Sequence, residues 1–283
     1  ALELVTIGDS VTSIGNGAFS GCSALQSLII GNSVTSIGLD AFKSCTSLQT
    51  LILNGDYVTN DFVSNSFSES KESLKYVVLG DSVMSIGNYA FSSCSKLQSL
   101  IIGDSVTSIG ERTFQSCIDL QSVTIGDSVT SIGGFAFFNC RALKNLTIGD
   151  SVTSIGNSAF QGCSKLTDVT IPDSVTTIGS TAFQGCSNLT EVTIPDSVTT
   201  IGSTAFSFCN ALTTLSIGNG VTSIGDGVFL QCTSLDNVTL GDKVEAISKN
   251  AFVKSKEFTL NIGISGNRTD IQEDLLLENS KLV

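Results

Sequence analysis

The chain has 283 residues, of which 41% are apolar, and its 26 acidic and 14 basic side chains give a formal charge of −12. This acidic balance argues against nucleic acid as a partner, because phosphate binding needs a basic surface. No apolar run approaches the roughly 20 residues of a membrane helix, so membrane insertion is not expected, and the apolar content suffices for a large core.

Cysteine recurs at one fixed interval along most of the chain. The spacing is 23 residues everywhere except for one gap of 49, as the positions show: Cys22, Cys45, Cys94, Cys117, Cys140, Cys163, Cys186, Cys209 and Cys232. A leucine leads each of eleven units at the same period, except for an interval of 26 residues after the third: Leu2, Leu25, Leu48, Leu74, Leu97, Leu120, Leu143, Leu166, Leu189, Leu212 and Leu235. Such a period is typical of a solenoid, in which each unit buries its apolar face by stacking on its neighbours.

The longer gap predicts a small insertion in the third unit. Two periods plus three residues separate Cys45 from Cys94, and we place the insertion within residues 54–73. Ser70 stands at the cysteine position of that unit, and Ser255 does so after Phe252, where the pattern decays. The expected organisation is an array over residues 1–255, followed by a degenerate last strand and a C-terminal capping segment over 256–283.

The first half of each unit predicts a short strand. In the eighth unit, Val169 and Ile171 alternate inward after Leu166, which leaves Thr170 facing outward. Pro172 and the aspartate after it then end the strand, because proline or glycine followed by aspartate favours a turn. Stacked units should therefore form a parallel sheet.

The second half of the unit returns the chain to its starting side. Val175 and Ile178 point inward from a second extended segment. Ala182, Phe183 and Cys186 are three or four residues apart, a spacing that predicts one helical turn. One circuit then closes every 23 residues.

Three linked blocks recur in most units: Leu-x-x-Val/Leu-x-Ile, Asp-Ser-Val-Thr-Ser-Ile-Gly and Ala-Phe-x-x-Cys. Over residues 2–255 they resemble the cysteine-containing, 23-residue leucine-rich repeats of the BspA-like or Treponema pallidum type. The resemblance implies a right-handed leucine-rich-repeat solenoid with one short parallel β-strand per repeat on a concave face. It also implies a cell-surface or secreted protein that binds host proteins or mediates adhesion, with no catalytic residues to transfer.

The two ends of the chain depart from the repeat. Residues 270–279 predict a short helix with Asp270 as its N-cap, which would cover the last unit. No charged-then-apolar leader precedes the first repeat, which indicates either a removed signal peptide or a fragment of a larger protein. An uncapped first unit predicts end-to-end self-association of the array.

The nine cysteines are expected to be buried, reduced thiols. Equivalent cysteines of stacked units lie ~5 Å apart but point the same way, whereas a disulfide needs two Cβ atoms directed at each other. A single column also lacks the paired Cys-x-x-Cys and histidine ligands of a zinc site. Neither a disulfide framework nor a metal site is therefore predicted.

Aspartate or asparagine occupies another column: Asp9, Asn32, Asp81, Asp104, Asp127, Asp150, Asp173, Asp196, Asn219 and Asp242. A ladder of carboxylates could bind calcium. Because asparagine replaces aspartate freely and serine usually follows, we interpret the column instead as side chains that cap local turn amides. In water, carboxylates ~5 Å apart repel by only about 1 kcal/mol.

An enzyme is not expected. The chain contains no histidine, no tryptophan and one methionine, and no acid, base and nucleophile depart together from the repeat pattern. No cofactor is implied, because the glycines occupy repeat turns.

Departures from the pattern on the outward face of the first strand predict a partner-binding site. Four consecutive units carry Ile29, Ile52, Val78 and Ile101 where the other units carry threonine or serine, and Tyr76 lies on the same face. We name these four residues the aliphatic stripe. Its expected polar rim is Gln26, Gln49, Lys75 and Gln98, and the insertion with Phe62 and Phe67 is expected beside it. The alternative, neutral exchange between β-branched residues on an exposed strand, stays open.

A secondary surface candidate lies on the opposite side. The position before the buried alanine or threonine reads Tyr89, Arg112 and Phe135 in three successive units, with Phe138 nearby. This ring–guanidinium–ring stack is either a ligand site or a self-satisfied cation–π ladder, and the structural interpretation is preferred.

Two classes of function follow. The first is a recognition or adhesion module of a cell-surface or secreted protein, which binds an extracellular or host protein, or a glycan, on the solenoid face. The second is a structural, surface-array or ice-binding solenoid that uses two threonine columns: Thr124, Thr147, Thr170 and Thr193, and Thr107, Thr130, Thr153, Thr176, Thr199 and Thr222. Four Asn-x-Thr sequons, at Asn145, Asn188, Asn237 and Asn267, are glycosylation acceptors in a eukaryotic secretory pathway, although a threonine-rich repeat also generates them by chance.

Overall fold

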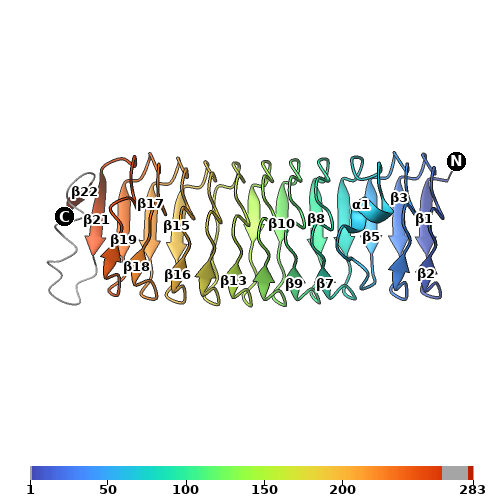
Figure 1. The fold of residues 1–283 in the computed structure, drawn as a ribbon, viewed down its shortest axis with the longest axis horizontal. Helices are drawn as coiled ribbons and strands as arrows, with labels where there is room; N and C mark the ends of the chain where they lie inside the picture. The colour runs from blue at the N-terminus through green and yellow to red at the C-terminus, as the bar shows by residue number, and fades with distance from the viewer. Residues whose placement is uncertain (1, 263–279, 283) are drawn as a thin grey trace.

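A computed structural model describes residues 2–262 and 280–282. The chain winds into a parallel-strand leucine-rich-repeat solenoid of about eleven turns, which confirms the predicted fold class. Figure 1 shows the turns stacked in a straight row, with the N-terminus at one end and the C-terminus at the other. The capping helix expected over 270–279, and the sequon at Asn267, lie outside the described residues.

The first half of every unit except the eighth forms a long strand, as the alternation of inward and outward residues predicted. Seven of these strands make one parallel sheet: β1 (Leu4–Ile7), β3 (Ser27–Ile30), β5 (Thr50–Leu53), β6 (Tyr76–Leu79), β8 (Ser99–Ile102), β10 (Ser122–Thr124) and β12 (Asn145–Thr147). Five more make a second parallel sheet: β15 (Glu191–Ile194), β17 (Thr214–Ile217), β19 (Asn237–Leu240), β21 (Phe258–Ile262) and β22 (Ser280–Leu282). We call their outward surface the long-strand face.

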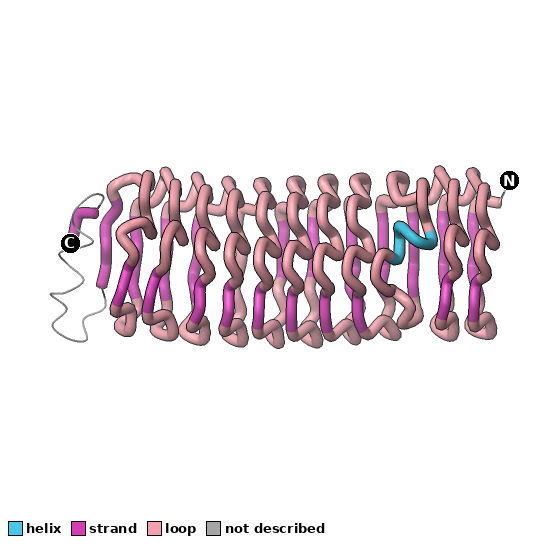
Figure 2. Tube along the Cα trace, in the orientation of Figure 1, coloured by secondary structure: helices cyan, strands magenta, loops and turns pink. Residues whose placement is uncertain are grey.

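The second extended segment of the unit forms a two-residue strand. These short strands pair in three parallel groups: β2 (Ser13–Ile14) and β4 (Ser36–Ile37); β7 (Ser85–Ile86), β9 (Ser108–Ile109), β11 (Ser131–Ile132), β13 (Ser154–Ile155), β14 (Thr177–Ile178) and β16 (Thr200–Ile201); and β18 (Ser223–Ile224) with β20 (Ala246–Ile247). In Figure 2 the short strands lie in front of the coil and the long strands pass behind its loops. The apolar core fills the space between them.

The prediction of a helical turn in the alanine–phenylalanine–cysteine segment is wrong. In the sixth unit, the amides of Ala136, Phe138 and Cys140 donate to carbonyls three residues back, whereas an α-helix bonds four residues back. The alternate amides, of Phe135 and Phe137 among others, donate to carbonyls of the next unit at 2.7–2.8 Å. Left-handed backbone at Phe135, with φ of 56°, reverses the chain where a helix would continue. The segment is a run of tight turns that join neighbouring units.

The insertion holds α1 (Phe62–Ser66), the one helix among the described residues. The amide of Val63 donates to the carbonyl of Ala90 at 2.9 Å, and the carbonyl of Ser66 accepts from the amide of Phe42 at 2.8 Å. The helix therefore bonds to both neighbouring units. Phe62 and Phe67 are buried in the core, so the expectation that they border an exposed patch is wrong. An apolar ring on an inserted turn is buried because the core continues through the insertion.

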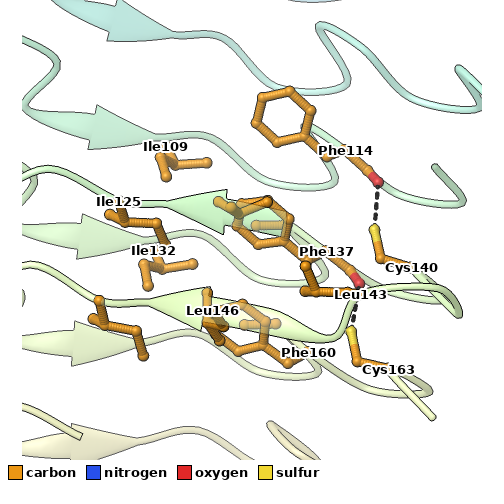
Figure 3. Packing of buried hydrophobic residues seen from close by; sticks show 14 of the residues in the cluster. Ile109, Phe114, Ile125, Ile132, Phe137, Cys140, Leu143, Leu146, Phe160 and Cys163 are labelled. Atoms are coloured by element: carbon orange, nitrogen blue, oxygen red, sulfur yellow. Dashed lines mark hydrogen bonds between the residues drawn. The ribbon is translucent and has the colours of Figure 1, made fainter. Parts of the chain in front are cut away.

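A column of phenylalanine rings runs through the core. The Phe137 ring lies 5.3 Å from those of Phe114 and Phe160, with interplanar angles of 15° and 2°. Figure 3 shows the three rings in a column, with the labelled isoleucines on one side and Cys140 and Cys163 on the other. Such separations fall in the range of about 4.5–7 Å that favours offset stacking of aromatic rings. At the insertion, Phe62 lies between Phe67 and Phe91, with centroids 5.4 and 6.0 Å away.

Removing one ring from this column should destabilise the protein more in the middle of the array than at its end. Phe137→Ala leaves a cavity between two rings, and we expect it to lower the free energy of unfolding by about 3–5 kcal/mol. Phe19→Ala is the matched control, because Phe19 is only partly buried and stacks on Phe42 alone. Urea unfolding followed by circular dichroism compares the two variants. Equal losses would contradict the column as the source of stability.

Candidate recognition surface

The structure places the aliphatic stripe on adjacent strands of one sheet. Parallel register pairs Ile29 with Ile52, Ile52 with Val78, and Val78 with Ile101. Thr6 flanks the stripe on one side and Thr124 on the other. Because side chains of paired residues point to the same face, the four aliphatic groups form one row across strands β3, β5, β6 and β8.

Exposure is uneven along this row. The Ile101 side chain is 56% exposed, whereas those of Ile29, Ile52 and Val78 are half-buried. Tyr76 precedes Val78 by two residues on β6 and is 45% exposed, opposite Thr50 and Ser99. Among the stripe residues and Tyr76, the most exposed apolar side chains are therefore those of Tyr76 on β6 and Ile101 on β8.

The predicted ring–guanidinium–ring stack is formed. The guanidinium carbon of Arg112 lies 5.5 Å from the Tyr89 ring centroid and 4.7 Å from that of Phe135. Arg112 also donates a hydrogen bond to the Tyr89 hydroxyl and pairs with Glu111 at 3.3 Å. Hydrogen bonding to Tyr89 and the nearby Glu111 carboxylate raise the pKa of Arg112. The Phe138 ring lies 5.6 Å from that of Phe135. These groups all bind one another, which agrees with the interpretation as a self-contained cation–π ladder.

The cysteine column is hydrogen bonded between units. The Cys140 thiol donates to the carbonyl of Phe114 at 3.2 Å, and the Cys163 thiol donates to the carbonyl of Phe137 at 3.3 Å (Figure 3). Burial raises the pKa of Cys140 to about 12. Ser70 and Ser255 make the same bond at the cysteine position, to Phe42 at 2.7 Å and to Phe229 at 2.9 Å. A small side chain with one donor is what this position requires.

Thiol labelling should distinguish one cysteine from the rest. Cys22 is partly exposed and the other eight cysteines are buried. An Ellman assay on the native protein is expected to find one reactive thiol, and nine after denaturation in urea, because reaction requires an accessible thiolate. Cys22→Ser should remove the native signal. Rapid labelling of several thiols in the folded protein would contradict the buried column.

Alkaline pH should weaken the fold through the same residues. Burial raises the pKa of Cys94, Cys140 and Cys186 from 9.0 to about 12. Above pH 9 the unfolded chain loses protons that the folded chain keeps, so the free energy of unfolding falls as pH rises from 9 to 12. In the Cys140→Ser variant the serine keeps the hydrogen bond but has no thiol to titrate. Its free energy of unfolding should therefore fall less steeply with pH than that of the native chain. Denaturant titrations at several pH values measure the slopes, and equal slopes would contradict this origin.

The aspartate and asparagine column joins units rather than capping local turns. The carboxylate of Asp127 accepts the amide of Asp150 at 3.1 Å, and that of Asp196 accepts the amide of Asn219 at 2.6 Å. A second column does the same, as where Asn157 accepts the amide of Ser180 at 2.8 Å. The predicted local caps are therefore replaced by bonds to the next unit, since stacking brings the equivalent amide within reach.

The described part of the chain contains no group of three or more histidine, cysteine, aspartate and glutamate side chains that could hold a metal ion. No helix within residues 2–262 and 280–282 is long and apolar enough to cross a membrane.

One feature escaped the analysis of the sequence. An open groove of about 710 Å³ lies where the long strands are interrupted, and we name it the basic groove from its lining residues: Ile118, Gln121, Arg141, Ala142, Lys144, Asn145, Lys165, Thr167 and Asn188. No strand forms over 168–171, between β12 and β15. The available signals were Pro172, which cannot donate to a sheet, and three cations close together in an acidic chain.

Comparisons with known proteins agree with this architecture. A family model described as a BspA type leucine rich repeat region matches residues 1–72, 60–175 and 153–283, with six copies. The structure of the pneumococcal vaccine antigen PcpA is 19% identical and covers 99% of this chain and 78% of its own, with a TM-score of 0.53, which shows a shared fold.

Two further solved structures are similar at lower TM-scores. A leucine rich cell surface protein from Faecalibacterium prausnitzii is 24% identical over 95% of this chain and 80% of its own, with a TM-score of 0.46. A leucine rich repeat protein from T. pallidum is 22% identical over 75% and 78%, also with a TM-score of 0.46. No curated protein sequence matches the chain significantly.

Proposed function

The chain belongs to the BspA-type leucine-rich repeat family, and from that membership we propose that it is a non-enzymatic recognition or adhesion module. In this proposal it is part of a cell-surface or secreted protein. Its partner is an extracellular or host protein that docks on the long-strand face over the aliphatic stripe.

The observation that carries the proposal is the continuity of the stripe. Paired strands hold its four side chains in one row, and Tyr76 extends the row sideways on β6. Neighbouring units present Thr6 and Thr124 at the same positions, so the apolar surface has defined limits. An apolar centre with a polar border is the usual composition of a protein-binding patch.

The backbone supports this role because it makes the surface rigid. Each strand of the stripe is hydrogen bonded to strands on both sides, and the opposite side of each strand packs on the core through buried residues such as Leu28 and Leu100. A partner that docks on such a face does not need to order it first, which reduces the entropic cost of association.

The chemistry of the exposed groups supports a binding role over catalysis. The chain has no histidine, and eight of its nine cysteines are buried with hydrogen-bonded or raised-pKa thiols. The outward columns carry mostly serine and threonine, residues that need an activating base to act as nucleophiles, and histidine, the commonest such base, is missing from the sequence.

The ice-binding alternative has less support. Its first threonine column is interrupted at Thr170, where no strand forms. In its second column the hydroxyls of Thr130, Thr153 and Thr176 each donate to the carbonyl of the preceding unit at 3.1–3.2 Å. The first column follows the long strands and each residue of the second immediately precedes a short strand, so the two columns do not form one flat face.

Exchange of the stripe for threonine tests the proposal. The variant carries Ile29→Thr, Ile52→Thr, Val78→Thr and Ile101→Thr, which restores the residue found in the other units. Affinity capture from extracellular-matrix and cell-surface extracts identifies partners of the native chain, and surface plasmon resonance then measures each affinity. We expect the variant to bind about tenfold more weakly or worse, because apolar centres of interfaces carry most of the binding energy.

A second variant removes the same number of exposed apolar groups elsewhere. It carries Val11→Thr, Leu39→Thr, Met84→Thr and Phe208→Ser, positions that are 38–61% exposed and outside the stripe. This control should bind as the native chain does, and both variants should melt near the native temperature. A partner that binds all three proteins equally would move recognition to another face, and thermal hysteresis of the native chain would favour the ice-binding alternative. End-to-end association of the array stays a prediction.

A further inference from the structure

The basic groove combines positive charge with a break in the solenoid. Three cations line it, Arg141, Lys144 and Lys165, and no acidic residue does. Within the part of the chain that the structure describes, none of the three forms an ion pair, whereas four other cations are each paired with a carboxylate: Lys43, Lys96, Arg112 and Lys256. In a chain with a net charge of −12, three unpaired cations around one groove are an exception.

The groove exists because two units separate locally. In other units the amide after the leading leucine donates to the unit before it, as Lys144 does to the carbonyl of Gln121 at 2.9 Å and Thr190 does to that of Thr167 at 3.2 Å. The amide of Thr167 donates to no carbonyl of the preceding unit, nor do those of residues 168–171. Pro172 has no amide hydrogen to restore the contact.

This separation leaves one backbone donor of the groove, the Thr167 amide, without a hydrogen-bond acceptor among the described residues. The Thr167 hydroxyl donates to the neighbouring Asp168 carboxylate at 2.8 Å. Amide side chains of Gln121, Asn145 and Asn188 complete the lining. Amide groups both donate and accept, and the cations only donate, so the groove offers mainly donors.

We propose that the basic groove binds a short acidic saccharide, a carbohydrate chain that carries carboxylate or sulfate groups. The cations bind its anionic groups by charge-assisted hydrogen bonds. The amides of Gln121, Asn145 and Asn188 bind its hydroxyl groups, which also donate and accept. The lining residues come from four successive units, a distance of three strand spacings or about 15 Å, which suits a ligand of a few sugar rings.

Three observations favour a short saccharide over other anions. The volume of about 710 Å³ lies within the range of small-ligand sites. Only Ile118 and Ala142 are apolar and no aromatic ring lines the groove, so it lacks the deep apolar anchor pocket that peptide docking uses. The net charge of −12 repels a long polyanion at distance, whereas a ligand with a few charges senses mainly the local cations.

Isothermal titration calorimetry with defined oligosaccharides tests this site. The probes are trigalacturonate for carboxylates, a sulfated heparin tetrasaccharide for sulfates, neutral maltotriose and the acidic peptide tri-aspartate. The protein is produced in a bacterial host, so that Asn145 and Asn188, which stand in Asn-x-Thr sequons, carry no glycan. We expect at least one acidic saccharide to bind, with weaker binding at high salt, and maltotriose and tri-aspartate to bind at least tenfold more weakly.

Charge-matched variants assign the binding to the groove. The variant R141Q/K144Q/K165Q should bind the acidic saccharide about 10- to 100-fold more weakly, since three exposed ion pairs are lost. The variant K243Q/K249Q/K254Q removes three charges from exposed positions of the last units and should bind as the native chain does. All six side chains are exposed, so both variants should fold, which circular dichroism verifies.

Each contrary outcome overturns the proposal in a distinct way. Failure of both acidic saccharides to bind removes it, and equal binding of maltotriose shows that the cations play no part. Equal binding of tri-aspartate makes the groove a peptide site, and equal losses in the two triple variants attribute binding to overall charge. The inference does not depend on the aliphatic stripe, so the stripe variant should bind the saccharide normally.

Discussion

Hydrogen bonding between residues one turn apart is the constraint on which the whole molecule depends. The long strands pair residue by residue at a separation of 23, as Thr6 with Ile29, and alternate amides of the tight turns continue the same contacts. Side chains reinforce them, because Asp127 and Asn157 accept amides, and Thr153 donates to a carbonyl, one unit away. Where the spacing differs from 23, as between Thr50 and Tyr76 or between Asn237 and Thr259, the strands still pair, because the change in length falls outside the strands. The insertion is tolerated because α1 supplies amides and carbonyls to both neighbours at the right positions.

The same constraint determines which residues the core accepts. Each core side chain packs on its own equivalent in the next unit, so a residue that stacks well on itself recurs, as the phenylalanine rings do at 5.3 Å near Phe137. The cysteine position needs a small group that donates to the phenylalanine carbonyl of the preceding unit. Serine meets that requirement at Ser70 and Ser255, which explains why a thiol is dispensable there. Burial keeps the thiols protonated and therefore unreactive. The cysteine column thus contributes packing and hydrogen bonds to the fold.

Because stacking restricts the residues of the core and the backbone, the chemically largest differences between units appear on outward positions and at breaks in the sheet. The aliphatic stripe and the basic groove are of these two kinds. The stripe runs from β3 to β8 and the groove lies around β12, and the two share only the unit that begins at Leu97, so one solenoid carries two chemically distinct surfaces along its length. One surface is apolar and suits a protein; the other is cationic within an acidic molecule and suits a small anion.

The sequence by itself determined the repeat, the fold, the insertion, the buried cysteine column and the row in which Ile29 and Ile101 stand, because all of these follow from a strict period and the alternation of residues in a strand. Only the tertiary structure decided features that depend on the distance between units. Tight turns replaced the expected helical turn because alternate amides bond to the next unit, and the Asp127 column joins units for the same reason. Phe62 proved to be buried, and the basic groove appeared, because packing decides whether adjacent units close on each other or separate, and no single unit contains that information.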